Sequence, residues 1–228
     1  MNKNTKYKNG SYVIGWDFNE LKPLEPYKKK KETIKSNLFL VRKDFIEKYD
    51  LKLNQYLTLI LLKSNITVEP FVWNNHSELT EIRNNEIASV LYVNESNITL
   101  YLDFLRKEKF IFKGVDKYKK YWFINTKYYE ELKNNSNSII INLAFYSVCN
   151  TVESVLVLSN IWFDYFLKNK ILSKKEMFLK LPINKKTIEK HIENFKNMGI
   201  ISCKGKFSNE FIKQHKKFMH YEDMMIIQ

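Results

Sequence analysis

The sequence predicts a mainly α fold with small β-hairpins (α+β), arranged as two tandem domains of the same kind. Three observations carry this prediction. Of 228 residues, 44% are hydrophobic, so the chain can bury a sizeable core and wholesale disorder is excluded. Five Gly and four Pro are few for this length, which favours helices with short turns over a phosphate-cradling enzyme or an all-β barrel. The third observation is an internal repeat.

The repeat relates residues 86–112 to residues 176–202 by a shift of ninety positions without gaps. Apolar positions fall on apolar positions almost throughout, which indicates two copies of one supersecondary unit. The matched pairs are Glu86 with Glu176, Leu91 with Leu181, Val93 with Ile183, Asn94 with Asn184, Ile98 with Ile188, Leu102 with Ile192, Leu105 with Phe195, Phe110 with Ile200 and Ile111 with Ile201.

The first copy predicts two short helices that cross steeply. Apolar residues three and four positions apart give each helix one buried face. Between the helices, Asn94 is expected to cap the second one, its side-chain oxygen accepting from the N–H of Ser96 or Asn97. This is the helix-turn-helix pattern. The buried faces are Ile87, Val90 and Leu91 in the first helix, and Ile98, Leu102 and Leu105 in the second.

The second copy repeats the pattern, and its helix-capping residues are clearer. Ser173 and Glu176 predict a capping box for its first helix, and Asn184 is expected to cap the second. Gly199 suits the left-handed position that ends that helix. The predicted buried stripe of the second helix is Ile188, Ile192 and Phe195.

Each helix pair continues into a predicted hairpin and is preceded by a predicted helix. Residues 110–112 and 121–124 read as strands around a basic, Gly-containing turn at 113–120. The second hairpin, at 200–207, is weaker. Leading helices are expected at 54–63 and at about 150–168, the latter opened by Asn150 and Glu153. A helix-turn-helix followed by a basic hairpin is a winged helix, so the sequence predicts two tandem winged-helix domains.

The charge suggests a polyanionic partner. The formal net charge is +13 and the sequence pI is near 9.4, as in proteins that bind nucleic acid or an acidic surface. Residues 1–36 are expected to form a basic flexible arm. Residues 37–133 are expected to form a winged-helix domain for dimerisation and auxiliary DNA contacts. The main DNA-binding domain is expected at 138–228, after a boundary at 134–137.

Candidate DNA contacts come from both predicted domains. Lys185, Lys186 and Thr187 occupy the first turn of the second recognition helix, from which base-edge contacts usually come. In the first recognition helix, Glu95 and Asp103 would repel phosphates. The full candidate set is Lys185, Lys186, Thr187, Lys190 and His191 in the second recognition helix, Lys204 and Lys206 in the second wing, Lys113, Lys117, Lys119 and Lys120 in the first wing, and Asn97 and Arg106 in the first recognition helix.

No enzyme chemistry is indicated. The sequence has no P-loop, no serine elbow and no CxxC, and its four histidines, at 76, 191, 215 and 220, form no paired ligand cluster. We therefore expect neither catalysis nor a cofactor or metal. Trp73, Trp122 and Trp162 sit among apolar residues and are expected in the core.

The chain is expected to be cytoplasmic. Cys149 and Cys203 lie among apolar neighbours and are expected to be reduced core thiols. The N-terminus shows no signal-peptide pattern. The longest apolar stretch, 139–167, is interrupted by polar residues and is expected to be a core helix instead of a membrane span.

The segments ahead of the first helix pair resemble a known family. They are Ile34-Lys35-Ser36-Asn37, Phe45-Ile46-Glu47-Lys48-Tyr49, Leu51-Lys52-Leu53-Asn54-Gln55 and Leu57-Thr58-Leu59-Ile60-Leu61-Leu62. This order resembles the opening of the replication initiators of iteron-containing plasmids, where a K-S-N … L-I-E … Y … L-S-L-N-E-Q-R segment leads into the first winged helix. With the repeat, the resemblance covers most of residues 34–207.

The resemblance implies a concrete mechanism. A monomer of that family binds directly repeated origin sites on double-stranded DNA through both domains, bends the DNA, helps to melt an AT-rich stretch and recruits host replication proteins. A homodimer formed through the first domain represses the protein's own promoter. Two alternatives stay open: a winged-helix transcriptional regulator, and a winged-helix adaptor that contacts proteins.

Overall fold

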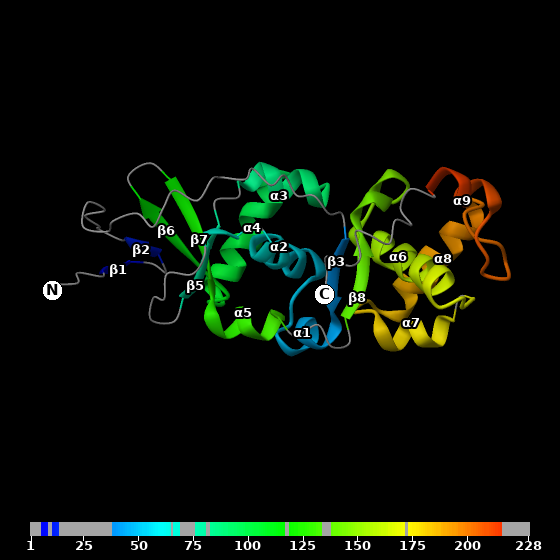
Figure 1. Cartoon of the computed structure of the whole chain (residues 1–228), viewed down its shortest axis with the longest axis horizontal. Helices are drawn as coiled ribbons and strands as arrows, with labels where there is room; N and C mark the ends of the chain where they lie inside the picture. The colour runs from blue at the N-terminus through cyan, green and yellow to red at the C-terminus, as the bar shows by residue number, and fades with distance from the viewer. Residues whose placement is uncertain are drawn as a thin grey trace. The chain divides into compact units, whose positions relative to one another are not determined.

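The computed structural model describes residues 6–8, 11–13, 38–64, 66–68, 76–80, 83–116, 119–133, 138–171 and 173–215. Over these residues the chain is mainly helical with small sheets (Figure 1), which confirms the α+β class. It divides into two compact units, residues 1–35 with 57–134 and residues 36–56 with 135–228. No described helix combines the length and the apolar character that crossing a membrane requires.

The first unit combines a six-stranded sheet with helices. The strand order is β1-β2-β6-β7-β5-β4, in which β2 and β6 are parallel and the other neighbours are antiparallel. Its elements are β1 (Lys6–Lys8), β2 (Ser11–Val13), most of α2 (Leu53–Ser64), β4 (Ile66–Val68), β5 (His76–Thr80), α3 (Asn84–Leu91), α4 (Glu95–Lys107), β6 (Ile111–Asp116), β7 (Lys119–Asn125) and α5 (Thr126–Lys133).

The core of the first unit is the one that the apolar spacing predicts, apart from Val90, which is half-buried. Ile87 and Leu91 of α3 are fully buried. A side chain of this size contributes about 1.5–3 kcal/mol when it leaves water, so these stripes fix the angle between the helices. The other buried residues are Leu57, Leu59, Leu61 and Leu62 of α2, Ile98, Leu102 and Leu105 of α4, and Phe110, Ile111, Trp122 and Ile124 around the hairpin.

The first hairpin is longer than predicted. Its strands extend into the segment predicted as a turn, with Gly114 opposite Tyr121 and Asp116 opposite Lys119. Lys113 is therefore a strand residue that lies opposite Trp122, and its Nζ is 6.0 Å from the centre of the Trp122 ring. Pairing across the hairpin satisfies the backbone, so basic residues remain in a strand despite their turn-like composition.

The second unit packs helices on a two-stranded sheet. Strands β3 and β8 pair antiparallel over five residues, and α6 packs on β8. Its elements are β3 (Leu38–Arg42), α1 (Lys43–Lys48), β8 (Ser138–Asn142), the 3₁₀ helix η1 (Leu143–Ser147), α6 (Val152–Leu167), α7 (Lys174–Lys180), α8 (Lys185–Asn197) and α9 (Asn209–His215).

The long apolar stretch is not one helix, contrary to the prediction. It begins as strand β8, because a run of three isoleucines at 139–141 favours extended backbone. Asn142 ends the strand, and its Oδ1 accepts from the N–H of Ala144 to open η1 (3.0 Å). Thr151, and not Asn150, caps α6, its Oγ1 accepting from the N–H of Ser154 (3.2 Å).

The domain limits differ from the predicted ones at one end. The division after Asn134 falls in the predicted boundary at 134–137. Residues 36–56, however, group with the second unit, because β3 pairs with β8 and Tyr56 bonds to β3. Of the predicted arm, β1 and β2 are strands of the first sheet, and the rest lies outside the described residues.

Candidate nucleic-acid interface

The second helices of the two repeat copies have matching boundaries, and the first helices, α3 and α7, begin at matching residues. Helix α4 covers Glu95–Lys107 and α8 covers Lys185–Asn197, so they correspond residue by residue at the shift of ninety. Both bury the predicted stripe, with Ile188, Ile192 and Phe195 on α8. The second residue after each pair's second helix has positive φ, Lys109 at 62° and Gly199 at 68°. Gly199 therefore adopts the predicted left-handed position.

The two second helices begin differently. The Oδ1 of Asn184 accepts from the N–H of Thr187 at 2.8 Å, as predicted. The side chain of Asn94 makes no such bond. Instead, the backbone carbonyl of Asn94 accepts from the backbone N–H of Asn97 at 2.9 Å. Asn94 is exposed, so water can satisfy the remaining N–H groups at this end.

The first helices of the pairs also differ in their caps. The Oγ of Ser173 accepts from the N–H of Glu176 (3.4 Å), which is half of the predicted capping box. The Glu176 carboxylate instead pairs with Lys180 (3.4 Å) and Lys170 (3.5 Å). In the first unit the other half of a capping box is present, because the backbone N–H of Arg83 donates to the side-chain carboxylate of Glu86 (2.8 Å).

Three lysines lie in the first half of α8. Lys185, Lys186 and Lys190, called here the α8 lysines, are exposed, and within the described residues none forms an ion pair with a carboxylate. The Nζ of Lys185 lies 5.8 Å from the centre of the Phe178 ring. The positive end of the helix dipole adds to the lysine charges and favours an anion here.

A tight loop presents two further lysines. The N–H of Ser202 donates to the carbonyl of Lys206, and the N–H of Gly205 donates to the carbonyl of Ser202, both at 2.8 Å. A single bridge, Ile201 to Phe207, closes the loop. Lys204 and Lys206, called here the loop lysines, are exposed.

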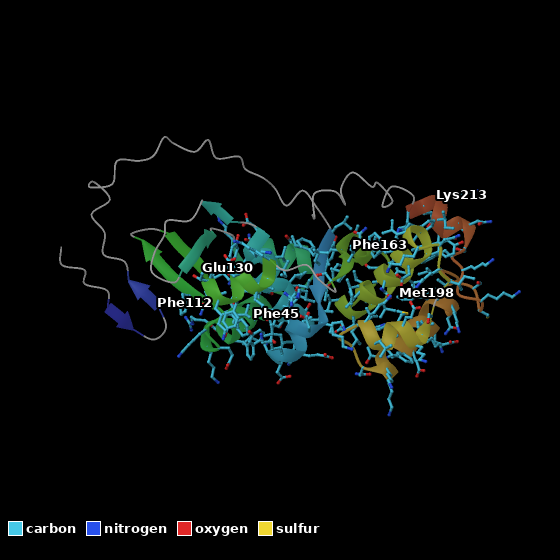
Figure 2. All side chains as sticks on the ribbon, turned by 60° about the horizontal axis from the view of Figure 1, so that its bottom comes forward. Phe45, Phe112, Glu130, Phe163, Met198 and Lys213 are labelled. Carbon is cyan, nitrogen blue, oxygen red and sulfur yellow. The ribbon has the colours of Figure 1, made fainter. Side chains whose placement is uncertain are left out.

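Lys185 and Lys186 lie in the first turn of α8, Lys190 lies near its middle, and the loop lysines follow its last turn. Thirteen residues of helix at 1.5 Å each separate the two ends of α8 by about 20 Å. Figure 2 labels Met198 at the far end of α8 and Lys213 on α9. The second unit therefore carries two basic patches, which suits contact with separate stretches of a phosphate backbone.

His191 and Thr187 are less exposed than the sequence predicts for DNA contacts. Both are half-buried, and the His191 ring lies 6.5 Å from the Phe195 ring. Burial lowers the pKa of His191 and Lys190 lowers it further, against an opposing effect of Glu153. A lowered pKa favours the neutral imidazole, so His191 is a poor source of positive charge for this surface.

The candidates of the first unit are more dispersed. Arg106 is half-buried and pairs with Asp103 (3.1 Å), and Asn97 is half-buried at the start of α4. The half-buried Lys113 lies against Trp122. For Lys119 and Lys120 the structure describes only the backbone, in β7, and Lys117 lies outside the described residues.

Leu100 is a surface residue that the sequence analysis did not identify. It is 65% exposed near the middle of α4. Its counterpart on α8 is Lys190, and Glu95 and Ser96 correspond to Lys185 and Lys186. A signal was available, because Leu100 does not fit the three-and-four spacing of Ile98, Leu102 and Leu105.

The cysteines lie in different environments. Cys149 is buried as predicted, and burial raises the pKa of its thiol to about 11. Cys203 is exposed, contrary to the prediction, because it lies at the tip of the loop. Trp122 and Trp162 are buried, as predicted, and Trp73 lies outside the described residues. No group of His, Cys, Asp and Glu within the described residues could hold a metal ion.

No family model, curated protein or solved structure matches this chain.

Proposed function

We propose that this chain is a sequence-specific double-stranded DNA-binding protein and that α8 is its recognition helix. One observation carries the proposal: Lys185, Lys186 and Lys190 are exposed in the first half of α8, with no carboxylate paired to them among the described residues. The first turn of such a helix contacts base edges in the major groove. The loop lysines would add phosphate contacts that position the helix.

We further propose that both units are winged helices. The order of elements supports this in the first unit: a helix, two strands, two helices and a hairpin, with β5 pairing to β7 and β7 to β6. In the second unit, α6, α7 and α8 follow in the same order, and the loop closed at Ile201 and Phe207 replaces the hairpin.

The biological role that we favour is initiation of plasmid or phage replication at repeated origin sites, without catalysis. Two tandem helix pairs in one chain and the resemblance of residues 34–62 to iteron-plasmid initiators support it. This role places the protein in the cytoplasm with host replication proteins as partners. A transcriptional regulator is the alternative, because it needs the same DNA chemistry.

A protein-contact role has its own support, limited to the first unit. The exposed side of α4 presents Glu95, Leu100 and Asp103 where α8 presents Lys185, Lys190 and Glu193. An exposed apolar side chain with an acid three residues away, on a helix that also begins with an acid, suits a protein surface better than DNA phosphates.

The test is a gel-shift titration of the purified protein on DNA flanking its own gene. The titration is run across a salt series with scrambled DNA as competitor. A ladder of discrete bands that survives competitor is the expected result and supports repeated sites. A single band at a two-fold symmetric site would favour a regulator, and a smear that salt erases would contradict specific binding.

A further inference from the structure

Two rows of exposed side chains run along α8, each made of residues one turn apart. The first row is Lys186, Lys190 and Asn194, and the second row is Lys185, Glu189 and Glu193. The first row is basic and then neutral, whereas the second row contains two carboxylates. Carboxylates repel phosphates, so their presence on this side of the helix calls for a partner other than the DNA backbone.

The two carboxylates of the second row differ in their partners. Glu193 Oε2 lies 3.4 Å from the Nζ of Lys196 on the same helix, so a cation already accompanies its charge. Glu189 forms no ion pair among the described residues, although Lys186 stands three residues before it on the helix. Glu189 therefore presents an unpaired carboxylate at nearly the same level of α8 as Lys190, one residue further on.

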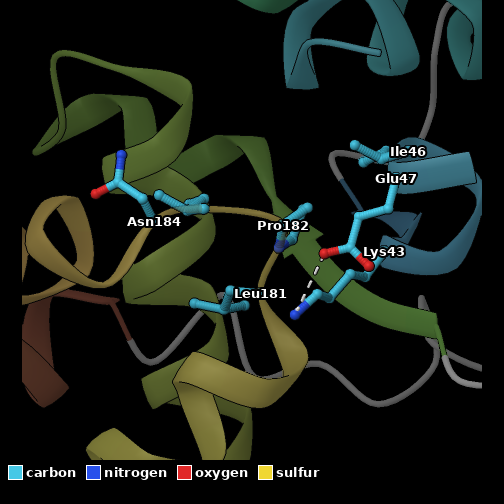
Figure 3. A pocket seen from close by; sticks show the side chains of 7 residues that line it. Lys43, Ile46, Glu47, Leu181, Pro182 and Asn184 are labelled. Atoms are coloured by element: carbon cyan, nitrogen blue, oxygen red, sulfur yellow. Dashed lines mark ion pairs between the residues drawn. The ribbon is translucent and has the colours of Figure 1, made fainter. Parts of the chain in front are cut away.

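The turn that leads into α8 is held by its neighbours. The Nζ of Lys43 on α1 donates to the carbonyl of Leu179 on α7 (2.8 Å) and pairs with Glu47 (3.5 Å). This ion pair and residues 181–184 of the turn line a cavity of about 300 Å³ (Figure 3). Leu181 in the turn is buried. A helix fixed at its start presents both rows in a defined direction, which recognition of bases requires.

The major groove of DNA offers different partners to lysine and to glutamate. A lysine ammonium only donates, and guanine presents two acceptors, O6 and N7. A carboxylate only accepts, and cytosine presents the N4 amino group as a donor. Adenine also has an amino group, but its N7 acceptor lies beside that group and repels a carboxylate. Neither row contains an apolar side chain that would match the methyl group of thymine, so G·C base pairs suit both rows best.

The spacing along α8 matches neighbouring base pairs. Residues four apart on a helix are separated by about 6 Å along its axis, and successive bases of one strand by about 3.4 Å. For a helix that lies along the groove, Lys186 and Lys190 therefore reach guanines about two steps apart. Glu189 is about 1.5 Å from Lys190 along the axis, so its carboxylate faces the cytosine of the same base pair or of the next one.

We propose that α8 recognises G·C base pairs, with Lys186 and Lys190 donating to guanine O6 and N7 and Glu189 accepting from cytosine N4. This inference rests on the proposed function, because it takes α8 as the recognition helix. It makes Glu189 a specificity-determining residue. The carboxylate of Glu189 weakens binding to every sequence by repelling phosphates, and only a site with a cytosine amino group opposite it compensates for that loss.

A purely electrostatic role of α8 predicts a different result when Glu189 is removed. If α8 contacted only phosphates, loss of this carboxylate would strengthen binding to all DNA alike. If Glu189 accepts from cytosine, its loss strengthens binding to scrambled DNA but weakens binding to the cognate site. The two roles therefore predict changes of opposite sign at the cognate site.

The test begins with enrichment of a random double-stranded DNA library on the full chain. Titrations of the enriched duplex and of a scrambled duplex then compare the parent with Glu189→Ala and Lys190→Ala. Lys213→Ala is the control for charge, since Lys213 lies on α9, outside both rows. All three residues are exposed, so none of the substitutions removes a core side chain. In parallel titrations, 7-deazaguanine replaces each guanine in turn, which removes N7 and keeps base pairing.

We expect the enriched sequences to share G·C base pairs. Glu189→Ala should bind the enriched duplex about tenfold more weakly and the scrambled duplex more tightly, whereas Lys213→Ala should change both about equally. One of the 7-deazaguanine duplexes should bind the parent about tenfold more weakly and should bind Lys190→Ala no differently from the unmodified duplex.

Two results would overturn this inference and leave the proposed function intact. One is tighter binding of both duplexes by Glu189→Ala, and the other is a set of enriched sequences that share no G·C pair. Failure to enrich any sequence would instead contradict the proposed function, and the inference with it.

Discussion

Helices α4 and α8 have the same length, the same register and the same buried stripe, but they expose different side chains. Where α8 carries Lys185 and Lys190, α4 carries Glu95 and Leu100. The buried face is constrained by packing, so both copies keep it. The exposed face is free to change with the partner. The comparison indicates that the two copies share the buried residues that pack the helices and differ in the exposed side chains that can contact a partner.

The largest expected effect concerns the buried residues that the two helices have in common. Ile98→Ala and Ile188→Ala each remove a fully buried side chain at corresponding positions. Each should lower the free energy of unfolding by about 2–5 kcal/mol, measured by denaturant titration. An effect on only one of the two would mean that the helix pairs are not equivalent in their packing.

The next largest effect concerns the exposed side chains, in which the two helices differ. The double variant Lys185→Ala with Lys186→Ala should lose about 2–3 kcal/mol of DNA-binding free energy, because it removes two exposed cations from the first turn of α8. The matched control is Glu95→Ala with Ser96→Ala on α4. Unchanged DNA affinity in the lysine variant would exclude α8 as the recognition helix.

The helix starts provide a smaller contrast. Asn184→Ala removes a side-chain cap and should cost about 1 kcal/mol of stability. Asn94→Ala removes a side chain that makes no cap bond, so its cost should be only a few tenths of a kcal/mol. Thermal denaturation of the two variants measures the difference, and equal losses would contradict the distinction.

The loop lysines should contribute affinity without specificity. Lys204→Ala with Lys206→Ala should weaken binding about equally on cognate and scrambled DNA. The slope of log affinity against log salt should fall by about 0.9 for each phosphate that the protein no longer neutralises. A variant that relaxes sequence preference instead would place these lysines on base edges.

The smallest effect concerns pH. Burial lowers the pKa of His191, so folding favours the neutral imidazole. Stability from this group is therefore complete above its ordinary pKa of about 6.5 and decreases as the pH falls below it. The melting temperature of the parent should fall more between pH 7 and pH 5.5 than that of His191→Gln. Identical pH profiles would show that His191 is not held neutral.

Local patterns in the sequence predicted the helix pairs well. The stripe at 188, 192 and 195 follows from helical periodicity, and Gly199 from the cost of a left-handed backbone for other residues. The same reasoning predicted Lys185 and Lys186 at the surface. These features depend on residues close in the chain, so a single sequence contains the information.

Features that depend on distant residues were not predictable. Nothing near Leu38 or Asn142 specifies that they face each other across about a hundred positions, so the limit of the second unit was missed. The exposure of Cys203 follows from a loop closed by backbone bonds, which its apolar neighbours did not reveal. His191 satisfied the helical spacing for exposure, and only packing against its neighbours shows that it is half-buried.

The Tyr56 hydroxyl has a consequence for the solution behaviour of the chain. It bonds to two outward groups of β3, the Leu40 carbonyl and the Arg42 N–H, and burial raises the pKa of the phenol, which keeps it protonated. Fibrous aggregation through a sheet needs two open edges on every molecule. Because the Tyr56 hydroxyl already occupies two outward groups of β3, another chain would have to displace it to add a strand there, so this single phenol disfavours growth of the sheet from β3.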